Sequence, residues 1–271
     1  MEINNQLSFL TVTYERDFDL LERLLNSIKL HVGTTYKHYI VLNDSIDHLA
    51  ELEEIIRKFP MQIEIILRDQ FQDFQLPLLE NSPFGHRFTQ TDEGWATQIM
   101  LTMLSAIEIK TPFYLHLCSK DVFGGPFDIN NVIKDGKTVV WNENFNHGGN
   151  TNQFIDYAIN ACKFLNLNFE QNKQFFIRPS TPGALNTQQM KNILDYLKEQ
   201  NISVVDLIGF NTGSFIDGVF QPSQNKTIEY YLYSAWLIKT QLVEETVIWH
   251  NSAIHNTLYN INMSYDLRRK N

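Results

Sequence analysis

Hydrophobic and polar positions along the first seventy residues predict strands and helices in alternation. Short apolar runs at Leu7–Thr13, His38–Asn43 and Gln62–Leu67 are rich in β-forming residues and predict buried strands. Between them, apolar residues recur every three or four positions at 17–31 and at 47–59, which predicts two amphipathic helices. This β-α-β-α-β order favours a parallel sheet with right-handed crossovers.

The next region contains the strand around which the predicted fold is organised. The stretch 71–91 shows no periodicity and is typical of a functional loop, and a helix is expected from 92 to about 109. The apolar run Phe113–Leu117 then predicts a central strand that ends in Cys118-Ser119-Lys120-Asp121. Ligands of open α/β sheets bind at the carboxyl ends of strands, so this polar loop is the first candidate site.

The second half of the chain has a weaker pattern. It contains neither an internal repeat nor a low-complexity linker, so we expect one continuous α/β fold. Its expected elements are strands at Thr138–Trp141, Gln174–Ile177 and Glu244–Trp249, helices at about 151–165, 186–200 and Thr227–Ile238, and a rigid loop at Pro179–Gly183.

Composition narrows the class of protein. The net charge of −9 and the pI near 5.3 argue against a nucleic-acid-binding surface, which needs clustered basic residues. Two cysteines provide no disulfide framework and favour a reducing compartment. No signal-peptide pattern and no apolar run near the length of a membrane span is found, so we expect a cytoplasmic protein. The basic residues Arg268, Arg269 and Lys270 permit a weak contact with an anionic membrane, and a plain solvated segment is the alternative.

Polar residues follow each predicted parallel strand, and the carboxyl ends of such strands meet at one edge of the sheet. Thr13 and Tyr14 follow the first strand, Asp44 the second, and Ser119 to Asp121 the central one. Asp44 is placed to bind a ribose hydroxyl or a base, and Tyr14 to stack on a base; capping of the next turn is the alternative for Asp44.

Phosphate binding by a glycine-rich loop is not indicated, because the chain has neither a GxGxxG nor a P-loop motif. A divalent cation that bridges carboxylates and phosphate oxygens is another way to hold a diphosphate. Asp121 is the candidate ligand, and a plain turn residue is the alternative.

Five segments resemble glycosyltransferases of the GT-A type and, more narrowly, the bacterial glycosyltransferase-like family DUF6492. They are FLTVTYERDFDLLERLLNSI (9–28), HYIVLND (38–44), GWATQ (94–98), PFYLHLCSKDVF (112–123) and TIEYYLY (227–233). The resemblance implies one GT-A-like domain with a Rossmann-type, mostly parallel sheet flanked by helices, in which 1–128 binds a nucleotide sugar and 129–271 forms the acceptor side.

The implied activity is transfer of a sugar from a nucleotide-sugar donor to a glycan or other hydroxyl acceptor, as in bacterial surface polysaccharide synthesis. Trp95 is either part of the donor site or part of the core. The residues expected to bind the donor are Thr13, Tyr14, Arg16, Asp44, Gln98, Ser119 and Lys120.

In that fold class an Asp-x-Asp-like motif after the central strand binds Mn²⁺ or Mg²⁺. Here Cys118 stands at the position of the first acid and leaves Asp121 alone, and a thiolate suits softer metals. His250, after a predicted late strand, is the best placed second ligand, with an ordinary capping histidine as the alternative.

Transfer with inversion needs a base that deprotonates the acceptor hydroxyl. The resemblance indicates Glu229, at the start of the TIEYYLY helix, and Asp217 competes for the role; Glu229 alternatively only interacts with the helix dipole. Two other functions stay open. One is a glycosyltransferase-like binding protein that has lost catalysis, which Cys118 favours; the other is a nucleotidyltransferase, which the lack of glycine in Thr11–Asp17 disfavours.

Overall fold

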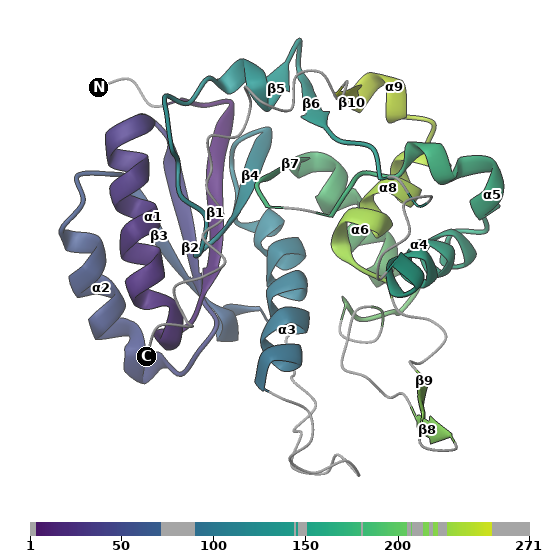
Figure 1. The fold of residues 1–271 in the computed structure, drawn as a ribbon, viewed down its shortest axis with the longest axis horizontal. Coiled ribbons are helices and arrows are strands. Elements are labelled where there is room, and N and C mark those ends of the chain that lie inside the picture. The colour runs from purple at the N-terminus through teal and green to yellow at the C-terminus, as the bar shows by residue number, and fades with distance from the viewer. Residues whose placement is uncertain are drawn as a thin grey trace.

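A computed structural model of the chain describes its sheet, the flanking helices and most connections between them (Figure 1). For 90–96, 151–153, 214–216 and 219–221 the description covers the backbone alone. The described residues are 4–71, 90–143, 145, 151–179, 181–204, 207, 214–216, 219–221 and 227–250.

The main sheet has five strands in the order β3-β2-β1-β4-β7. The first four of these strands are parallel, and β7 runs antiparallel to β4. The α/β class with a mainly parallel sheet flanked by helices, as predicted, is therefore confirmed. The strands are β1 (Leu7–Thr13), β2 (Lys37–Leu42), β3 (Ile63–Leu67), β4 (Phe113–Cys118) and β7 (Gly183–Asn186).

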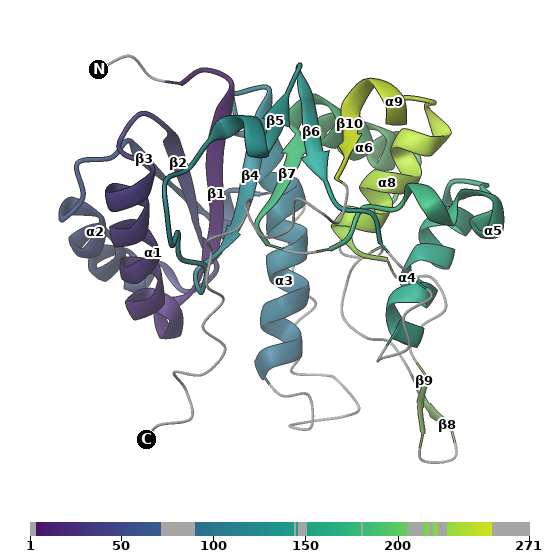
Figure 2. The same ribbon diagram turned by 45° about the horizontal axis from the view of Figure 1, so that its top comes forward.

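Helices cover both faces of this sheet, as Figures 1 and 2 show from two directions. The helices α1 and α2 lie on one face, and α3, α6 and α8 lie on the other. Several of the helices adjoin a 3₁₀ turn, among them Glu15–Asp17 before α1, Ile46–His48 before α2, Ser105–Ile107 after α3 and Lys173–Phe175 after α5. The helices are α1 (Phe18–His31), α2 (Leu49–Arg57), α3 (Gln90–Leu104), α4 (Thr151–Phe164), α5 (Phe169–Asn172), α6 (Thr187–Glu199), α8 (Glu229–Lys239) and α9 (Val243–Thr246).

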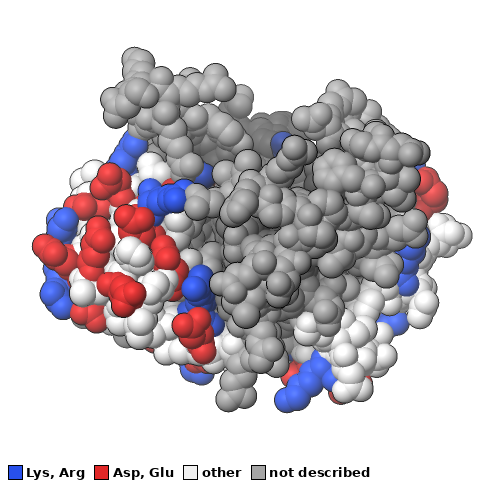
Figure 3. Space-filling view, turned by 90° about the horizontal axis from the view of Figure 1, so that it is seen from below, with Lys and Arg blue, Asp and Glu red and all other residues white. Residues whose placement is uncertain are grey.

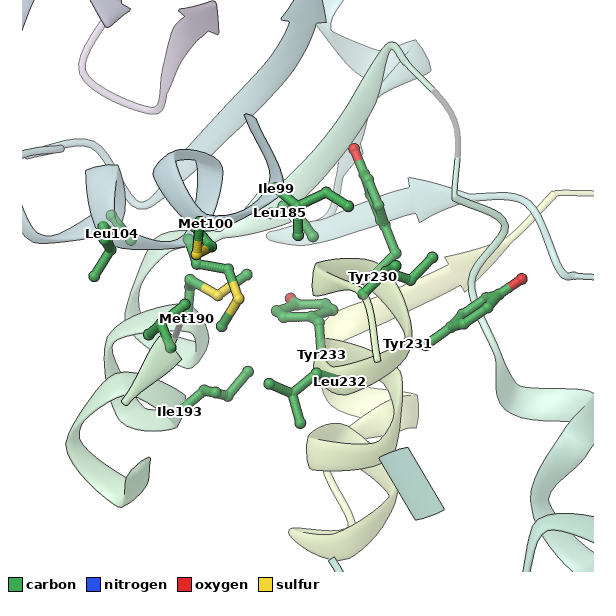
Figure 4. Packing of buried hydrophobic residues seen from close by; sticks show 14 of the residues in the cluster. Ile99, Met100, Leu104, Leu185, Met190, Ile193, Tyr230, Tyr231, Leu232 and Tyr233 are labelled. Carbon is green, nitrogen blue, oxygen red and sulfur yellow. The ribbon is translucent and has the colours of Figure 1, made fainter. Parts of the chain in front are cut away.

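Side-chain alternation along β4 divides the interior into two hydrophobic clusters. Leu115 and Leu117 belong to the cluster beneath α1 and α2, whereas Tyr114 belongs to the cluster beneath α3, α6 and α8. Figure 4 shows part of the second cluster, in which Tyr233 points toward Met100 and Met190. Because both faces are covered, β4 is apolar almost throughout, which is typical of a parallel strand.

A change of direction in the strand order creates the place where ligands bind in such sheets. From β1 the chain adds β2 and β3 on one side, and then returns to place β4 on the other side of β1. The carboxyl ends of β1 and β4 therefore flank a topological switch point, where a crevice forms in open α/β sheets.

Smaller sheets account for most strands of the second half. A three-stranded sheet has the order β10-β6-β5, and a two-stranded hairpin joins β8 to β9. The hairpin flanks 217–218, so the predicted Asp217 lies outside the described residues. These strands are β5 (Ile133–Lys134), β6 (Lys137–Val140), β8 (Ser214–Ile216), β9 (Val219–Gln221) and β10 (Val247–Trp249).

Two strand predictions in the second half were wrong, wholly or in part. In place of the strand Gln174–Ile177 there is a 3₁₀ turn at Lys173–Phe175, and Ile177 makes one isolated bridge to Asn142. The first part of the strand expected at Glu244–Trp249 is helical, because two acidic residues occupy the first turn of α9, where the helix dipole favours them. The strand β7 was not predicted, since four residues carry too little pattern.

Charged side chains lie mostly on the surface helices. On the face seen in Figure 3, acidic and basic side chains are interspersed on the side of the molecule where α1 and α2 lie. At α1 and α2, Lys58 pairs with Glu22 at 3.1 Å and Arg57 with Glu53 at 2.8 Å. Within the described part of the chain, none of the helices has the length and apolar character that crossing a membrane requires.

The N-terminus of α6 provides a test of the fold. The Asn186 side chain accepts a hydrogen bond from the Gln189 N–H at 3.0 Å, as expected of a helix cap. Replacement by alanine leaves that N–H unpaired, so Asn186→Ala should lower the free energy of unfolding by about 1 kcal/mol. Urea denaturation measures this loss, with Gln188→Ala at an exposed position of the same helix as the control. Equal stabilities of the two variants would contradict the capping role.

Candidate functional site

The carboxyl ends of β1 and β4 bring two predicted donor-binding residues into contact. Val12 pairs with Cys118 in the parallel ladder, which places Thr13 beside Ser119. The Ser119 hydroxyl donates a hydrogen bond to the Thr13 Oγ1 at 3.1 Å, and both side chains are buried. This bond joins the two strand ends that flank the switch point.

Asp121 organises the loop that follows β4. Its Oδ2 accepts the Cys118 N–H at 2.8 Å, and its own N–H donates to the Cys118 carbonyl at 2.9 Å. The Oδ1 accepts a longer bond, of 3.4 Å, from the Thr181 hydroxyl. Burial raises the pKa of Asp121 to about 6, although these bonds and Lys120 favour the charged form. The Asp121 carboxylate thus closes the turn, which is the alternative to a metal ligand that the sequence left open for this residue.

Cys118 lies beside two carboxylates at the end of β4. Burial raises the pKa of its thiol, and the negative charges of Asp121 and Asp17 act in the same direction. Asp17 is a site residue that the sequence reasoning missed, because it was assigned only to the start of a helix. It is the N-terminal cap residue of α1, yet its buried side chain makes no capping bond.

Asp44 joins the loops after β1 and β2. Its Oδ2 accepts the Glu15 N–H at 3.1 Å, and its Oδ1 accepts the Ser45 N–H at 2.8 Å. The preceding Asn43 is buried and donates to the Thr97 hydroxyl of α3 at 2.8 Å. Asn43 and Thr97 were not singled out in the sequence, although both occur in the segments that carry the resemblance. Asp44 therefore has the turn-capping role, and its role toward a nucleotide stays a prediction.

The other predicted donor residues surround this edge with different exposures. Arg16 and Lys120 are exposed, whereas Tyr14 and Gln98 are half-buried. The side chain of Trp95 lies outside the described residues. Contact of these residues with a nucleotide sugar stays a prediction.

Glu229 is a buried acid in the first turn of α8. It is 5% exposed, and its Oε2 has no hydrogen-bond partner in the part of the chain that the structure describes. Burial raises the pKa of Glu229 to about 7, partly offset by a hydrogen bond from its own backbone N–H. Burial raises the pKa of Tyr114 on β4, and the charges of Tyr233 and Glu229 act in the same direction. A carboxylate of this kind exchanges a proton near neutral pH.

The first turn of α8 is tied to the carboxyl half of β4. The Tyr230 hydroxyl lies 3.4 Å from the Nδ1 of His116, and the two rings are stacked at a centroid distance of 6.4 Å. His116 precedes Cys118 by two residues on the same strand. Glu229 and the Asp121 loop are thereby attached to the two ends of one short segment of β4.

The described residues do not provide a set of ligands that fits a resident Mg²⁺ or Mn²⁺. Among them no group of three or more His, Cys, Asp or Glu side chains could hold a metal ion. The β4 loop offers one carboxylate and a thiol that burial keeps protonated. His250 follows β10, where its N–H donates to the Val140 carbonyl and its ring packs beside Trp141.

Residues 5–264 match the protein-family model DUF6492, which is described as a family of unknown function. The chain belongs to this family. Among curated proteins none matches the sequence.

Two solved structures are similar to this DUF6492 protein over most of its length. The apo structure of the bifunctional glycosyltransferase WbbM has a TM-score of 0.46 and 11% identity, with 92% of this chain and 39% of that chain covered. The apo form of mouse xyloside xylosyltransferase 1 has a TM-score of 0.41 and 9% identity, with 91% and 85% covered. The DUF6492 chain thus spans well under half of the WbbM chain, and both likenesses concern the fold.

The raised pKa of Glu229 makes stability depend on pH in a defined direction. A folded-state pKa of about 7, above the ordinary 4.5, means that the uncharged acid is the better tolerated form. The stability that this provides is present below pH 4.5 and is lost as pH rises through 7. Glu229→Gln removes the cost of ionisation, which linkage places at about 3 kcal/mol well above pH 7.

Thermal unfolding of Glu229→Gln and of the natural protein between pH 4.5 and 8.5 measures this effect. The variant should become the more stable protein as pH rises, and the difference should shrink toward pH 4.5. Glu54→Gln, at an exposed position of α2, controls for the loss of one carboxylate charge. A difference independent of pH would place Glu229 in a solvated environment.

Proposed function

We propose that this DUF6492 protein is a glycosyltransferase that moves a sugar from a nucleotide-sugar donor to a hydroxyl group of a glycan acceptor. Synthesis of a bacterial surface polysaccharide is the setting in which such an acceptor occurs. The proposal combines a donor site at the carboxyl ends of β1 and β4 with an acid on α8 that acts on the acceptor.

Glu229 is the observation that carries the proposal. In the reaction, the acceptor oxygen forms a bond to the anomeric carbon, the bond from that carbon to the diphosphate breaks, and a base takes the acceptor proton. A base works best when its pKa lies near the working pH. The pKa of about 7 and the unpartnered Oε2 give Glu229 both the proton affinity and a free lone pair for this role.

The switch point between β1 and β4 supports the placement of the donor. The edge carries the joined hydroxyls of Thr13 and Ser119, and Asp44 fixes the neighbouring loop at Glu15. The exposed cations Arg16 and Lys120 belong to the same loops and suit the negative charge of a diphosphate.

A divalent cation belongs to the proposal only as a prediction. Asp121 is the acid of the β4 loop that would face it, and a bound diphosphate would supply further oxygen ligands. The residues described here contribute by holding the loop and by accepting a proton.

A binding protein that has lost catalysis is the second candidate. It is favoured by the role of Asp121, whose two oxygens close the turn with Cys118 and Thr181 instead of standing free. In this case the protein would bind a nucleotide sugar without transferring its sugar.

Substitution of the two acids separates the candidates. Glu229→Gln should lower the transfer rate by about 100-fold or more, since general base catalysis contributes that much. In the natural protein kcat/KM should rise with pH and level off above about 7, because the ionised carboxylate is the active form. Release of nucleoside diphosphate in the presence of an acceptor measures the rate. Glu54→Gln is the control, and full activity of Glu229→Gln would exclude the acid as the base.

Donor and metal can be identified together by thermal shift. The panel contains UDP-, GDP- and dTDP-sugars, each with Mn²⁺, with Mg²⁺ and with EDTA, because a ligand of the native state raises Tm by mass action. A shift that EDTA abolishes indicates a metal-dependent donor site, and one that survives EDTA indicates that basic side chains suffice. Cys118→Asp should increase the shift in Mn²⁺ if its side chain faces the diphosphate. An unchanged response would place this residue in the core instead.

A further inference from the structure

A chain of hydrogen-bonded side chains crosses the hydrophobic layer between α8, β4 and α3. The Tyr230 hydroxyl of α8 lies 3.4 Å from the His116 Nδ1, and the His116 Nε2 lies 3.3 Å from the Thr102 Oγ1 of α3. All three side chains are at most 2% exposed. In Figure 4 the hydroxyl of Tyr230 points away from Met100 and Met190, toward which Tyr233 points. Buried polar groups in such a layer are tolerated when they satisfy one another.

The hydrogen bonds of Thr102 determine which atom donates and which accepts in every bond of this series. Its hydroxyl donates to the Gln98 carbonyl at 2.8 Å, so its oxygen is left to accept from the His116 Nε2–H. The Nδ1 of His116 then carries a lone pair, which accepts the Tyr230 O–H. A neutral imidazole with its proton on Nε2 is the form that satisfies every bond. Burial supports this form, because it lowers the pKa of His116 to about 4.

This series of hydrogen bonds ends beside two of the residues proposed to act on substrate. Tyr230 directly follows Glu229 in the first turn of α8, and the carbonyl at the other end belongs to Gln98. A second bond, from the Tyr114 hydroxyl to the Thr102 carbonyl at 3.4 Å, holds the same turn of α3 against β4. The first turn of α8 and the last turn of α3 are thus both hydrogen-bonded to β4.

Local capping does not fix the first turn of α8. Its N-terminal cap residue is Ile228, whose side chain forms no capping bond. Thr227 binds the Tyr157 carbonyl of α4 at 2.9 Å and anchors the residue before the cap. The bond between Tyr230 and His116 ties this turn to β4, while the Tyr231 hydroxyl ties it to Glu143 Oε2 at 3.1 Å.

We propose that His116 is a positioning residue of this protein, which holds the first turn of α8 so that the Glu229 carboxylate keeps a fixed position relative to the β4 loop. His116 acts through Tyr230 and contacts no reacting atom. The inference deepens the proposed glycosyl transfer and rests on it for its effect on rate, whereas its effect on α8 can be measured independently.

Two matched substitutions on α8 test the role in catalysis. Tyr230→Phe removes the hydroxyl bound to His116, and Tyr233→Phe removes an equally buried hydroxyl that accepts the Asn186 N–H at 3.1 Å. Tyr230→Phe should lower kcat by about tenfold or more, because small displacements of a reacting group are costly. Its KM for the donor should stay within about twofold of the natural value. Tyr233→Phe should keep kcat near the natural value, and equal losses in both variants would overturn the proposal.

At the α3 end of the hydrogen-bond series, a conservative substitution of Thr102 should preserve activity where a non-polar one does not. Thr102→Val keeps the shape of the side chain and removes its hydroxyl, whereas Thr102→Ser keeps the hydroxyl. The valine variant should lose kcat as Tyr230→Phe does, and the serine variant should retain it. Activity lost in both, or in neither, would contradict a role that depends on this hydrogen bond.

Hydrogen exchange of α8 tests the positioning even if no transfer is detected. The N–H groups of Tyr231 and Leu232 donate to the Ile228 carbonyl and report on the first turn. Their exchange in the native protein should accelerate in Tyr230→Phe and stay unchanged in Tyr233→Phe, which would support the positioning role. Unchanged exchange in both would overturn it, and absence of transfer in the natural protein would instead overturn the proposed function.

Discussion

The parallel pairing of β1 with β4 is the constraint on which the rest of the structure depends. Because of this pairing, β4 lies on the side of β1 opposite to β2 and β3. The pairing also places Leu115 and Leu117 in one hydrophobic cluster and Tyr114 in the other. Each face of β4 therefore requires its own layer of helices. The same register brings the ends of both strands level, so that the hydroxyls of Thr13 and Ser119 meet.

The interior next to β4 contains many polar groups, and most of them are paired. His116, Thr102 and Tyr230 satisfy one another, and the carboxylate of Asp121 is bonded on both oxygens. Among the described residues, Glu229 is the only acid with a buried oxygen that lacks a partner. An unpaired buried carboxylate is costly and is more often found where chemistry requires it, which is why Glu229 carries the proposed function.

The loop after β4 shows how burial changes the chemistry of an acid. In water an Asp side chain is ionised at neutral pH and a thiol is mostly protonated. A pair of carboxylates in this position would attract a divalent cation. Here burial raises the pKa of both Cys118 and Asp121, and the nearby Asp17 acts against ionisation of the thiol. With a pKa of about 6, Asp121 is still mostly ionised at neutral pH, whereas the Cys118 thiol is protonated, and hydrogen bonds between the two residues hold the loop. Any cation would depend heavily on the oxygens of a bound ligand.

The sequence by itself determined the α/β class, the parallel strands of the first half and the helices with a strong apolar stripe, because those patterns are local and repeat along the chain. It also indicated that polar residues after the strands gather at one edge, as Thr13 and Ser119 do. It did not reveal β7, whose four residues become a strand only because β4 offers an unpaired edge. The strand expected at Gln174–Ile177 does not form, because among the described residues no strand lies beside it to pair with. Ile177 makes only an isolated bridge to Asn142.

The candidate site was decided mainly by tertiary structure. Glu229 could be selected from the sequence, but its burial and its pKa near 7 arise from elements far away in the chain. Asp17 and the pair Asn43–Thr97 were missed, because a carboxylate before a helix and an amide after a strand look like ordinary caps until their neighbours are known. The chain from Tyr230 through His116 to α3 joins three segments that are distant in sequence. Local periodicity fixes which segments form strands and helices, whereas the pKa of an acid and the direction of a hydrogen bond depend on what packs around them.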